Sequence, residues 1–143
     1  MPGKIPQHDA ARRERPGDET VGLVIRDIRT ERRVAYLPSC AALTPDLTSA
    51  IDGVDVLLFD GTLFTDHELI EQGLSERTGA AMGHISMSGS KGSIESLRRI
   101  AIQRRILIHL NNSNPVLRGN SRERAFVTEA GWEVAHDGME ITL

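Results

Sequence analysis

The chain of 143 residues has a formal net charge of −3 and is 39% hydrophobic, 26% charged and only 3% aromatic. This length predicts one domain, and the composition is typical of a soluble globular protein. No apolar run approaches the ~20 residues that span a bilayer, and the polar residues 1–19 lack the apolar core of a signal peptide. The single cysteine, Cys40, excludes an internal disulfide and favours a cytoplasmic location.

The charge is distributed unevenly along the chain. Residues 34–96 contain two basic and nine acidic residues, whereas both flanks are mildly basic. Nucleic-acid binding requires a dense basic stripe, so the acidic centre argues against a nucleic-acid partner. Such a centre is better suited to binding a cation.

The predicted elements begin after an extended or disordered lead-in over residues 1–19, which combines proline, glycine and charged residues. Residues 20–28 and 33–37 predict two strands joined by a polar turn. Thr44 is the expected N-cap of a helix that runs to about residue 51, with proline at its first position. Residues 54–59 are nearly all apolar, as expected for a central strand that is covered on both faces.

The middle of the chain predicts short helices around a loop. Residues 65–68 match a capping box, which predicts a helix from residue 65 to about residue 72. Residues 79–92 are rich in glycine and serine and predict an ordered loop. Ser93 is then the expected cap of a helix through residue 101.

The last third of the chain predicts a buried strand over residues 106–110 and a helix over residues 121–130. Asp137-Gly138 is a strong turn signal and predicts a terminal hairpin with strands over residues 132–136 and 139–143. Two strands before the first helix, followed by alternating strands and helices, predict a mixed sheet packed by helices. The expected class is therefore α/β or α+β.

Three residues at or just past apolar runs are candidate metal ligands. Asp60 follows the strand predicted over residues 54–59; it lies where α/β sheets bind their ligands, or it simply begins a turn. His109 ends a second apolar run and is either a ligand or a satisfied core histidine. His84 follows a glycine in the predicted loop, where it is either aimed into a cleft or solvated.

Other polar residues have simpler expected roles. Asn111, Asn112 and Asn114 follow a buried strand, where they either satisfy loose backbone groups or position a ligand. His67 is expected at the surface, and Cys40 is expected to be a small buried residue rather than a nucleophile. The sequence contains no Gly-x-Ser-x-Gly nucleophile elbow, so a Ser-His-Asp site is not indicated.

The segments around the three candidate ligands also carry a family resemblance. They read Leu58-Phe59-Asp60-Gly61-Thr62, Met82-Gly83-His84 and Ile108-His109-Leu110-Asn111-Asn112, and further matching runs are residues 2–6, 36–38, 130–133 and 137–141. With these motifs the chain resembles the C-terminal half of the coenzyme PQQ synthesis protein B family, from Pro2 to Leu143. PQQ is the cofactor pyrroloquinoline quinone.

This resemblance implies half of a metallo-β-lactamase-like αββα sandwich over residues 20–143. It also implies that Asp60 and His109 are metal ligands and that His84 lies beside the metal as a catalytic acid/base or a further ligand. The implied cofactor is a divalent metal, iron or zinc. We expect this chain alone to bind the metal weakly or not at all, because it lacks the family's first half with its Asp-His metal motif.

The resemblance further implies that PQQ or its precursor is a partner. The family is assigned to PQQ biosynthesis, either as a metal-dependent enzyme acting on the tyrosine of a peptide precursor or as a carrier that transports PQQ or its precursor to the periplasm. A carrier needs cations, and Arg98-Arg99 and Arg104-Arg105 are the candidates. An inactive truncated product is a third alternative. An uncovered sheet face favours pairing with a separate N-terminal half or self-association.

Overall fold

The computed structural model describes residues 20–143, so the lead-in expected over residues 1–19 lies outside the described part of the chain. A five-stranded sheet of order β1-β2-β3-β4-β5 forms its centre. The strands are β1 (Leu23–Arg26), β2 (Arg33–Leu37), β3 (Val56–Asp60), β4 (Arg104–Ile108) and β5 (Trp132–Val134). Only the β1–β2 pair is antiparallel. The predicted mixed sheet and the α/β class are therefore confirmed.

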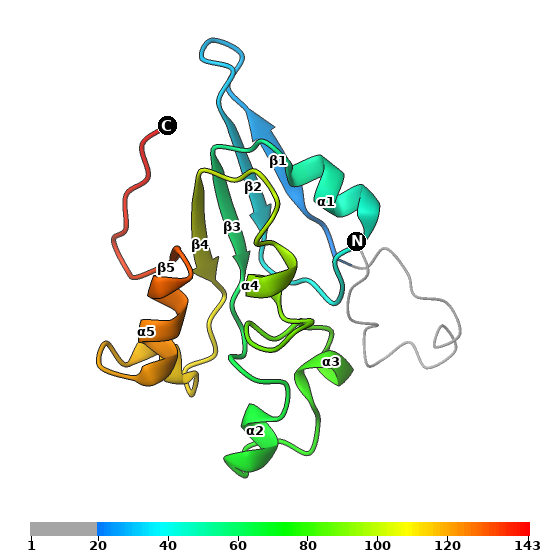
Figure 1. Ribbon diagram of the computed structural model, residues 1–143, viewed down its shortest axis with the longest axis vertical. Helices are drawn as coiled ribbons and strands as arrows, with labels where there is room; N and C mark the ends of the chain where they lie inside the picture. The colour runs from blue at the N-terminus through cyan, green and yellow to red at the C-terminus, as the bar shows by residue number, and fades with distance from the viewer. Residues whose placement is uncertain (1–19) are drawn as a thin grey trace.

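The helices are short and lie between or after the strands (Figure 1). They are α1 (Pro45–Ile51), α2 (Glu68–Glu71), α3 (Gly79–Met82), α4 (Ser93–Ser96), the 3-10 helix Pro115–Leu117 and α5 (Arg122–Glu129). Helix α1 begins at its predicted cap, where the Thr44 side chain accepts a hydrogen bond from Leu47 N–H. Helix α5 lies within the predicted residues 121–130, and its N-cap Ser121 accepts from Arg124 N–H. Within residues 20–143, no helix is long and apolar enough to cross a membrane.

One face of the sheet, which we call the core face, carries the hydrophobic core. On strands β2, β3 and β4 its apolar residues are at most 1% exposed and are Ala35, Leu37, Leu57, Phe59 and Leu107. Val24 of the edge strand β1 also lies on this face and is 45% exposed. They form one cluster with Ile51 of α1, Ile94 of α4 and Val127 of α5. Phe59 also meets the Trp132 ring edge to face, with 6.2 Å between the ring centroids. Helices α1, α4 and α5 therefore pack on this face.

The opposite face of the sheet is also apolar but remains partly open, and we call it the open face. Its apolar residues alternate with those of the core face along the strands. Leu23, Ile25 and Tyr36 are 48%, 56% and 39% exposed, and Val34, Leu58 and Ile108 are half-buried. Val56 and Ile106 also lie on this face and are buried. By the same alternation, Asp60 follows Leu58 at the end of this face.

The segment around α3 and α4 differs from the sequence prediction. The predicted loop over residues 79–92 contains α3, whose start is capped by the Thr78 side chain. The helix predicted from Ser93 to residue 101 is only one turn long, and its N-cap is Gly92. A Cβ at Gly92 would lie only 2.3 Å from the Ser88 carbonyl oxygen, so the helix enters at a backbone contact that only glycine permits. Neither the presence of α3 nor the early end of α4 is marked in the sequence by apolar residues at helical spacing.

The predicted capping box forms only in part. Helix α2 begins at Glu68 rather than at Thr65, and its N-cap His67 makes no side-chain cap bond. The Glu68 carboxylate still accepts hydrogen bonds from Phe64 N–H at 2.7 Å and Thr65 N–H at 3.4 Å. Its burial raises the pKa of Glu68 above the ordinary value. The glutamate therefore fixes the loop before the helix rather than the helix start.

The predicted terminal hairpin is wrong. The turn forms, because Gly138 has a φ of 77° and Met139 N–H donates to the His136 carbonyl. The strand before it, β5, pairs in parallel with β4, whereas residues 139–143 form no strand. A two-stranded ladder needs a buried apolar face, and Met139 and Ile141 are only half-buried. The turn signal alone therefore does not produce the second strand.

Candidate metal centre

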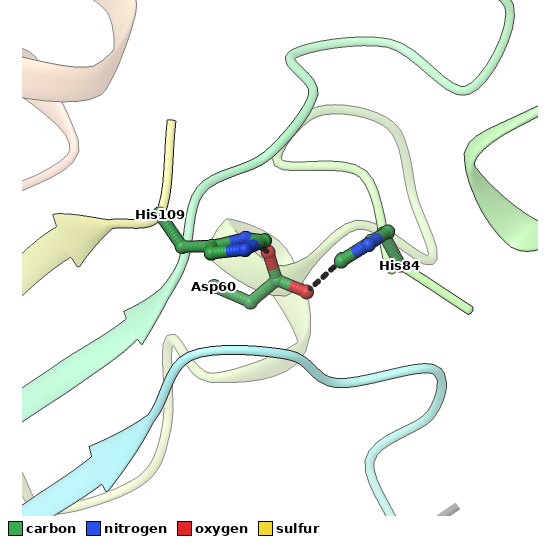
Figure 2. Close-up of side chains that lie close together, drawn as sticks. All are labelled: Asp60, His84 and His109. Atoms are coloured by element: carbon green, nitrogen blue, oxygen red, sulfur yellow. Dashed lines mark hydrogen bonds and ion pairs between the residues drawn. The ribbon is translucent and has the colours of Figure 1, made fainter. Parts of the chain in front are cut away.

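The three candidate ligands meet at the carboxyl end of the sheet. Asp60 is the last residue of β3, and His109 directly follows β4, whose Ile108 is paired with Asp60. His84 comes from the loop after α3, which ends at Gly83 with a φ of 85°. Figure 2 shows the Asp60 carboxylate between the two imidazole rings. One potential ligand atom of each residue lies within 4.8 Å of the other two.

The Asp60 carboxylate is fully buried and surrounded by donors. Its Oδ1 accepts hydrogen bonds from the Thr62 hydroxyl at 2.6 Å and from Thr62 N–H at 3.1 Å. Its Oδ2 accepts from Cys40 N–H at 2.8 Å and lies 2.8 Å from His84 Nδ1. Because a buried charge costs several kcal/mol unless it is paired, these donors hold the carboxylate in place. Asp60 thus makes the expected turn bond and also belongs to the ligand cluster.

The Thr62 hydroxyl contacts all three candidate ligands, and the sequence reasoning did not assign it a role. Its oxygen lies 2.6 Å from Asp60 Oδ1, 3.1 Å from His84 Nδ1 and 2.8 Å from His109 Nδ1. The hydroxyl has one proton to donate, which the Asp60 carboxylate accepts, and its lone pairs are available to a histidine ring N–H. The sequence does contain a signal for this role, the turn Asp60-Gly61-Thr62. Such a turn brings the side chain two positions after the aspartate close to the aspartate carboxylate.

His109 reaches the cluster through an unusual backbone conformation. Its φ is 55°, in the left-handed region that costs a non-glycine residue about 1–3 kcal/mol. The ring stacks on that of His84, with 5.5 Å between the centroids and 23° between the planes. The His109 side chain is 53% exposed, whereas that of His84 is 13% exposed. His109 is therefore the more solvent-exposed of the two histidines, and His84 the more enclosed.

A buried asparagine fixes the turn that carries Thr62. The Asn114 side-chain amide donates to the carbonyl oxygens of Gly61 and Thr62, both at 3.1 Å, and its Oδ1 accepts from Val116 N–H. A Cβ at Gly61 would lie 3.0 Å from the Ile108 carbonyl oxygen, so glycine lets this turn pass close to β4. Of the two roles expected for Asn114, the structure shows the backbone-satisfying one.

The side chains of His67 and Cys40 do not belong to the ligand cluster. The His67 side chain is 62% exposed on the surface, as expected. The Cys40 side chain is fully buried. Burial and the negative charge of Asp60 raise the pKa of the Cys40 thiol to about 12. Such a thiol stays protonated at neutral pH, so Cys40 is a structural residue and not a nucleophile.

The arginines considered for anion binding are mostly engaged elsewhere. Arg104 makes a two-pronged ion pair with Glu133, at 2.5 and 2.8 Å, and holds the pKa of that carboxyl below its usual value. Arg105 donates to the Ile100 carbonyl at 2.9 Å. Arg98 lies 3.6 Å from Glu95. These three side chains therefore do not form the unpaired guanidinium cluster that a tricarboxylate carrier needs.

The donor set fits a divalent transition metal. Two imidazoles and one carboxylate are the ligands preferred by zinc and by non-haem iron. Three protein ligands and a solvent-exposed side are also the arrangement of a metal site that keeps a coordination position open. Asp60 is already oriented by Cys40 N–H and Thr62, as metal-bound carboxylates usually are.

The sheet and the ligand cluster at its carboxyl end define the class of protein. Residues 4–110 match the family model described as "Beta-lactamase superfamily domain", and the chain belongs to this superfamily. Within it, the chain is 44% identical over 147 residues to the coenzyme PQQ synthesis protein B of Xanthomonas campestris pv. campestris. It is 47% identical over 146 residues to the protein of that name from Methylorubrum extorquens. The resemblance predicted from the sequence is confirmed.

The match covers all of this chain but only part of the relatives. Both alignments include 100% of this chain and 48% of the relative, so the chain spans about half the length of the curated relatives it matches. A crystal structure of Zn²⁺-bound PqqB from Methylobacterium extorquens is similar, with a TM-score of 0.84 and 50% identity. That similarity covers 87% of this chain and 44% of the PqqB chain. The fold is therefore that of one half of such a protein.

Proposed function

We propose that this chain is the C-terminal half of a PQQ-biosynthesis protein whose metal centre acts on the tyrosine of a peptide-derived precursor. The observation that carries the proposal is the cluster of Asp60, His84 and His109, in a chain whose relatives are named for PQQ synthesis. A cytoplasmic location fits the single reduced cysteine, Cys40.

In this proposal Asp60 and His109 hold the metal, and either iron or zinc suits their donor atoms. A divalent metal bound there would act as a Lewis acid. His84 is the more enclosed of the two histidines, and its Nδ1 lies 2.8 Å from Asp60 Oδ2. The carboxylate orients the imidazole so that it can take up or release a proton at the pocket side. The Thr62 hydroxyl contacts both histidine rings and the carboxylate, and so helps to fix their relative positions.

The proposal includes a protein partner, because the two proposed ligands of this chain, Asp60 and His109, leave the coordination shell of zinc or iron incomplete. The open face runs from β1 to the end of β3 that carries Asp60, so a partner covering this face comes close to the metal site. A separate N-terminal half is the partner that the length of the relatives favours. When no N-terminal half is present, the alternative partner is a second copy of this chain, bound through the exposed Leu23, Ile25 and Tyr36.

Calorimetric titration with zinc and with ferrous iron tests the proposal. We expect weak metal binding by the chain alone, tighter binding when the N-terminal half of a relative is added, and loss of binding in Asp60→Asn and His109→Asn. Asparagine at residue 109 tolerates the left-handed backbone, so the second variant keeps its conformation. His67→Asn, at an exposed histidine outside the cluster, is the matched control. Tight stoichiometric binding by the isolated chain, or equal binding by wild type and Asp60→Asn, would contradict the proposal.

A further inference from the structure

A pocket of about 640 Å³ lies directly beside the metal centre. Residues 41–43 line it on one side and residues 84–86 and 88–92 on the other, with Asp66, Ala80 and Ser96 at its borders. His84 belongs both to this lining and to the ligand cluster, so the pocket and the candidate metal site share one side chain. The volume lies within the ~300–1,000 Å³ of small-molecule sites.

The walls of the pocket are held by hydrogen bonds rather than by flexible side chains. Ile85 N–H donates to the Cys40 carbonyl at 2.7 Å, which joins the two sides. The backbone N–H and the hydroxyl of Ser88 both donate to the Phe64 carbonyl, at 3.0 and 2.7 Å. Ser93 N–H donates to the Ser86 carbonyl at 2.9 Å. The pocket is therefore formed before a ligand arrives, which lowers the entropic cost of binding.

Two fixed charges of opposite sign line this pocket, besides the titratable His84. Asp66 has one carboxylate oxygen engaged by Ala80 N–H at 2.7 Å, and the other lies 3.8 Å from His67 Nδ1. Lys91 is exposed, is one of two basic residues in the acidic stretch 34–96, and makes no ion pair within residues 20–143. Within the described residues 20–143, Asp66 and Lys91 form no ion pair with each other, so each can face a charged group of opposite sign on a ligand.

The combination of charges and lining selects the kind of ligand. A ligand with several carboxylates meets only one cation here and is repelled by Asp66 and by nearby Asp60. A ligand with one carboxylate and one ammonium group satisfies both Lys91 and Asp66. The remaining lining combines Leu43, Ile85 and small alanine and glycine residues with four serines, so it suits a side chain that is largely apolar and carries a polar group.

We propose that this pocket binds an α-amino acid group, with its carboxylate on Lys91, its ammonium on Asp66 and its side chain directed along the pocket toward His84. The inference builds on the proposed function: it assigns the amino-acid part of the precursor to this pocket and disfavours the finished tricarboxylate quinone as its ligand. Lys91 and Asp66 are then the residues that determine specificity.

Titrations of the full chain with three soluble probes test this proposal. L-Phenylalanine carries both charged groups, phenethylamine lacks the carboxylate, and 3-phenylpropionate lacks the ammonium group. We expect phenylalanine to bind about tenfold more tightly than either analogue, because each lost group removes one charge-assisted hydrogen bond. Lys91→Met should lower the affinity for phenylalanine about tenfold and leave that for phenethylamine unchanged. Asp66→Asn should show the reverse preference, weakening phenylalanine but not 3-phenylpropionate.

The controls separate this proposal from that of the metal centre. Arg77→Met and Glu71→Gln change exposed charges outside the pocket lining and should bind phenylalanine as wild type does. Asp66→Asn keeps an oxygen for Ala80 N–H, and zinc titration of both pocket variants should match wild type. Equal affinity for all three probes, no measurable binding of phenylalanine, or unchanged binding in Lys91→Met would overturn the amino-acid pocket. Loss of zinc binding only in Asp60→Asn would still support the metal centre.

Discussion

The two faces of the sheet carry similar side chains in different surroundings. On the core face, Leu57, Phe59 and Leu107 are fully buried beneath α1, α4 and α5. On the open face, along the same inner strands, Tyr36 is 39% exposed and Leu58 and Ile108 are half-buried, although they too carry large apolar or aromatic side chains. Strands with one solvent-exposed face alternate apolar and polar residues, whereas strands that are covered on both faces are apolar throughout. The difference indicates that the open face is suited to another protein layer.

The largest expected effect lies on the core face. Phe59→Ala should lower the free energy of unfolding by about 3–5 kcal/mol, because it leaves a cavity and removes the edge-to-face contact with Trp132. Urea unfolding followed by circular dichroism measures this loss. A cost below about 1 kcal/mol would show that the core face is not the principal core of this chain.

The next largest effect on stability is expected at the candidate metal centre, at the carboxyl end of the sheet. Thr62→Val removes a hydroxyl that donates to a fully buried carboxylate, so we expect a loss of about 1–3 kcal/mol in stability and weaker zinc binding. Thr62→Ser keeps the hydroxyl and should restore most of both quantities. Equal zinc affinity in the valine and serine variants would contradict a positioning role for Thr62.

A smaller effect on stability is expected on the open face. Ile25→Thr keeps a β-branched residue on the exposed β1 and should change the free energy of unfolding of the isolated chain by less than about 1 kcal/mol. The same variant should reduce self-association, or the affinity for an added N-terminal half, in analytical ultracentrifugation. If stability falls as much as in Phe59→Ala while association stays constant, the two faces do not differ in the way described.

The smallest expected effect on stability concerns a thiol in the core. Because the pKa of Cys40 is raised to about 12, its thiolate is scarce in the folded protein even at pH 9. The unfolded chain ionises at lower pH, so this group contributes stability below the ordinary thiol pKa and loses it as the pH rises further. Iodoacetamide at pH 8 should label Cys40 slowly in the folded protein and rapidly in urea. Rapid labelling of the folded protein would contradict its burial.

The sequence predicted most of the framework because the relevant signals are local. The apolar runs before Asp60 and His109 predicted β3 and β4 within two residues of their observed bounds. The cap at Thr44 predicted α1, and the glycine at residue 131 marked the end of the helix region that contains α5. The terminal hairpin failed because a turn residue such as Gly138 fixes a bend but not the strand that should follow. Tertiary contacts decide whether the strand after the turn forms.

The candidate site was predictable in part for a similar reason. Asp60 and His109 stand out because each follows a strand, and parallel strands end at the same edge of the sheet. Thr62 has no such pattern, and its central place depends on a turn that Asn114 fixes from a distant loop. The pocket charges Asp66 and Lys91 are far apart in the sequence, and only the fold places them around one cavity.

The order of the strands in the sheet is the same as their order along the chain. Each strand therefore pairs with the strand that precedes it, and no segment must wait for a distant one before the sheet can grow. Such a nearest-neighbour topology shortens the loops that have to close during folding. The sheet can thus form strand by strand in the order in which its strands follow one another along the chain.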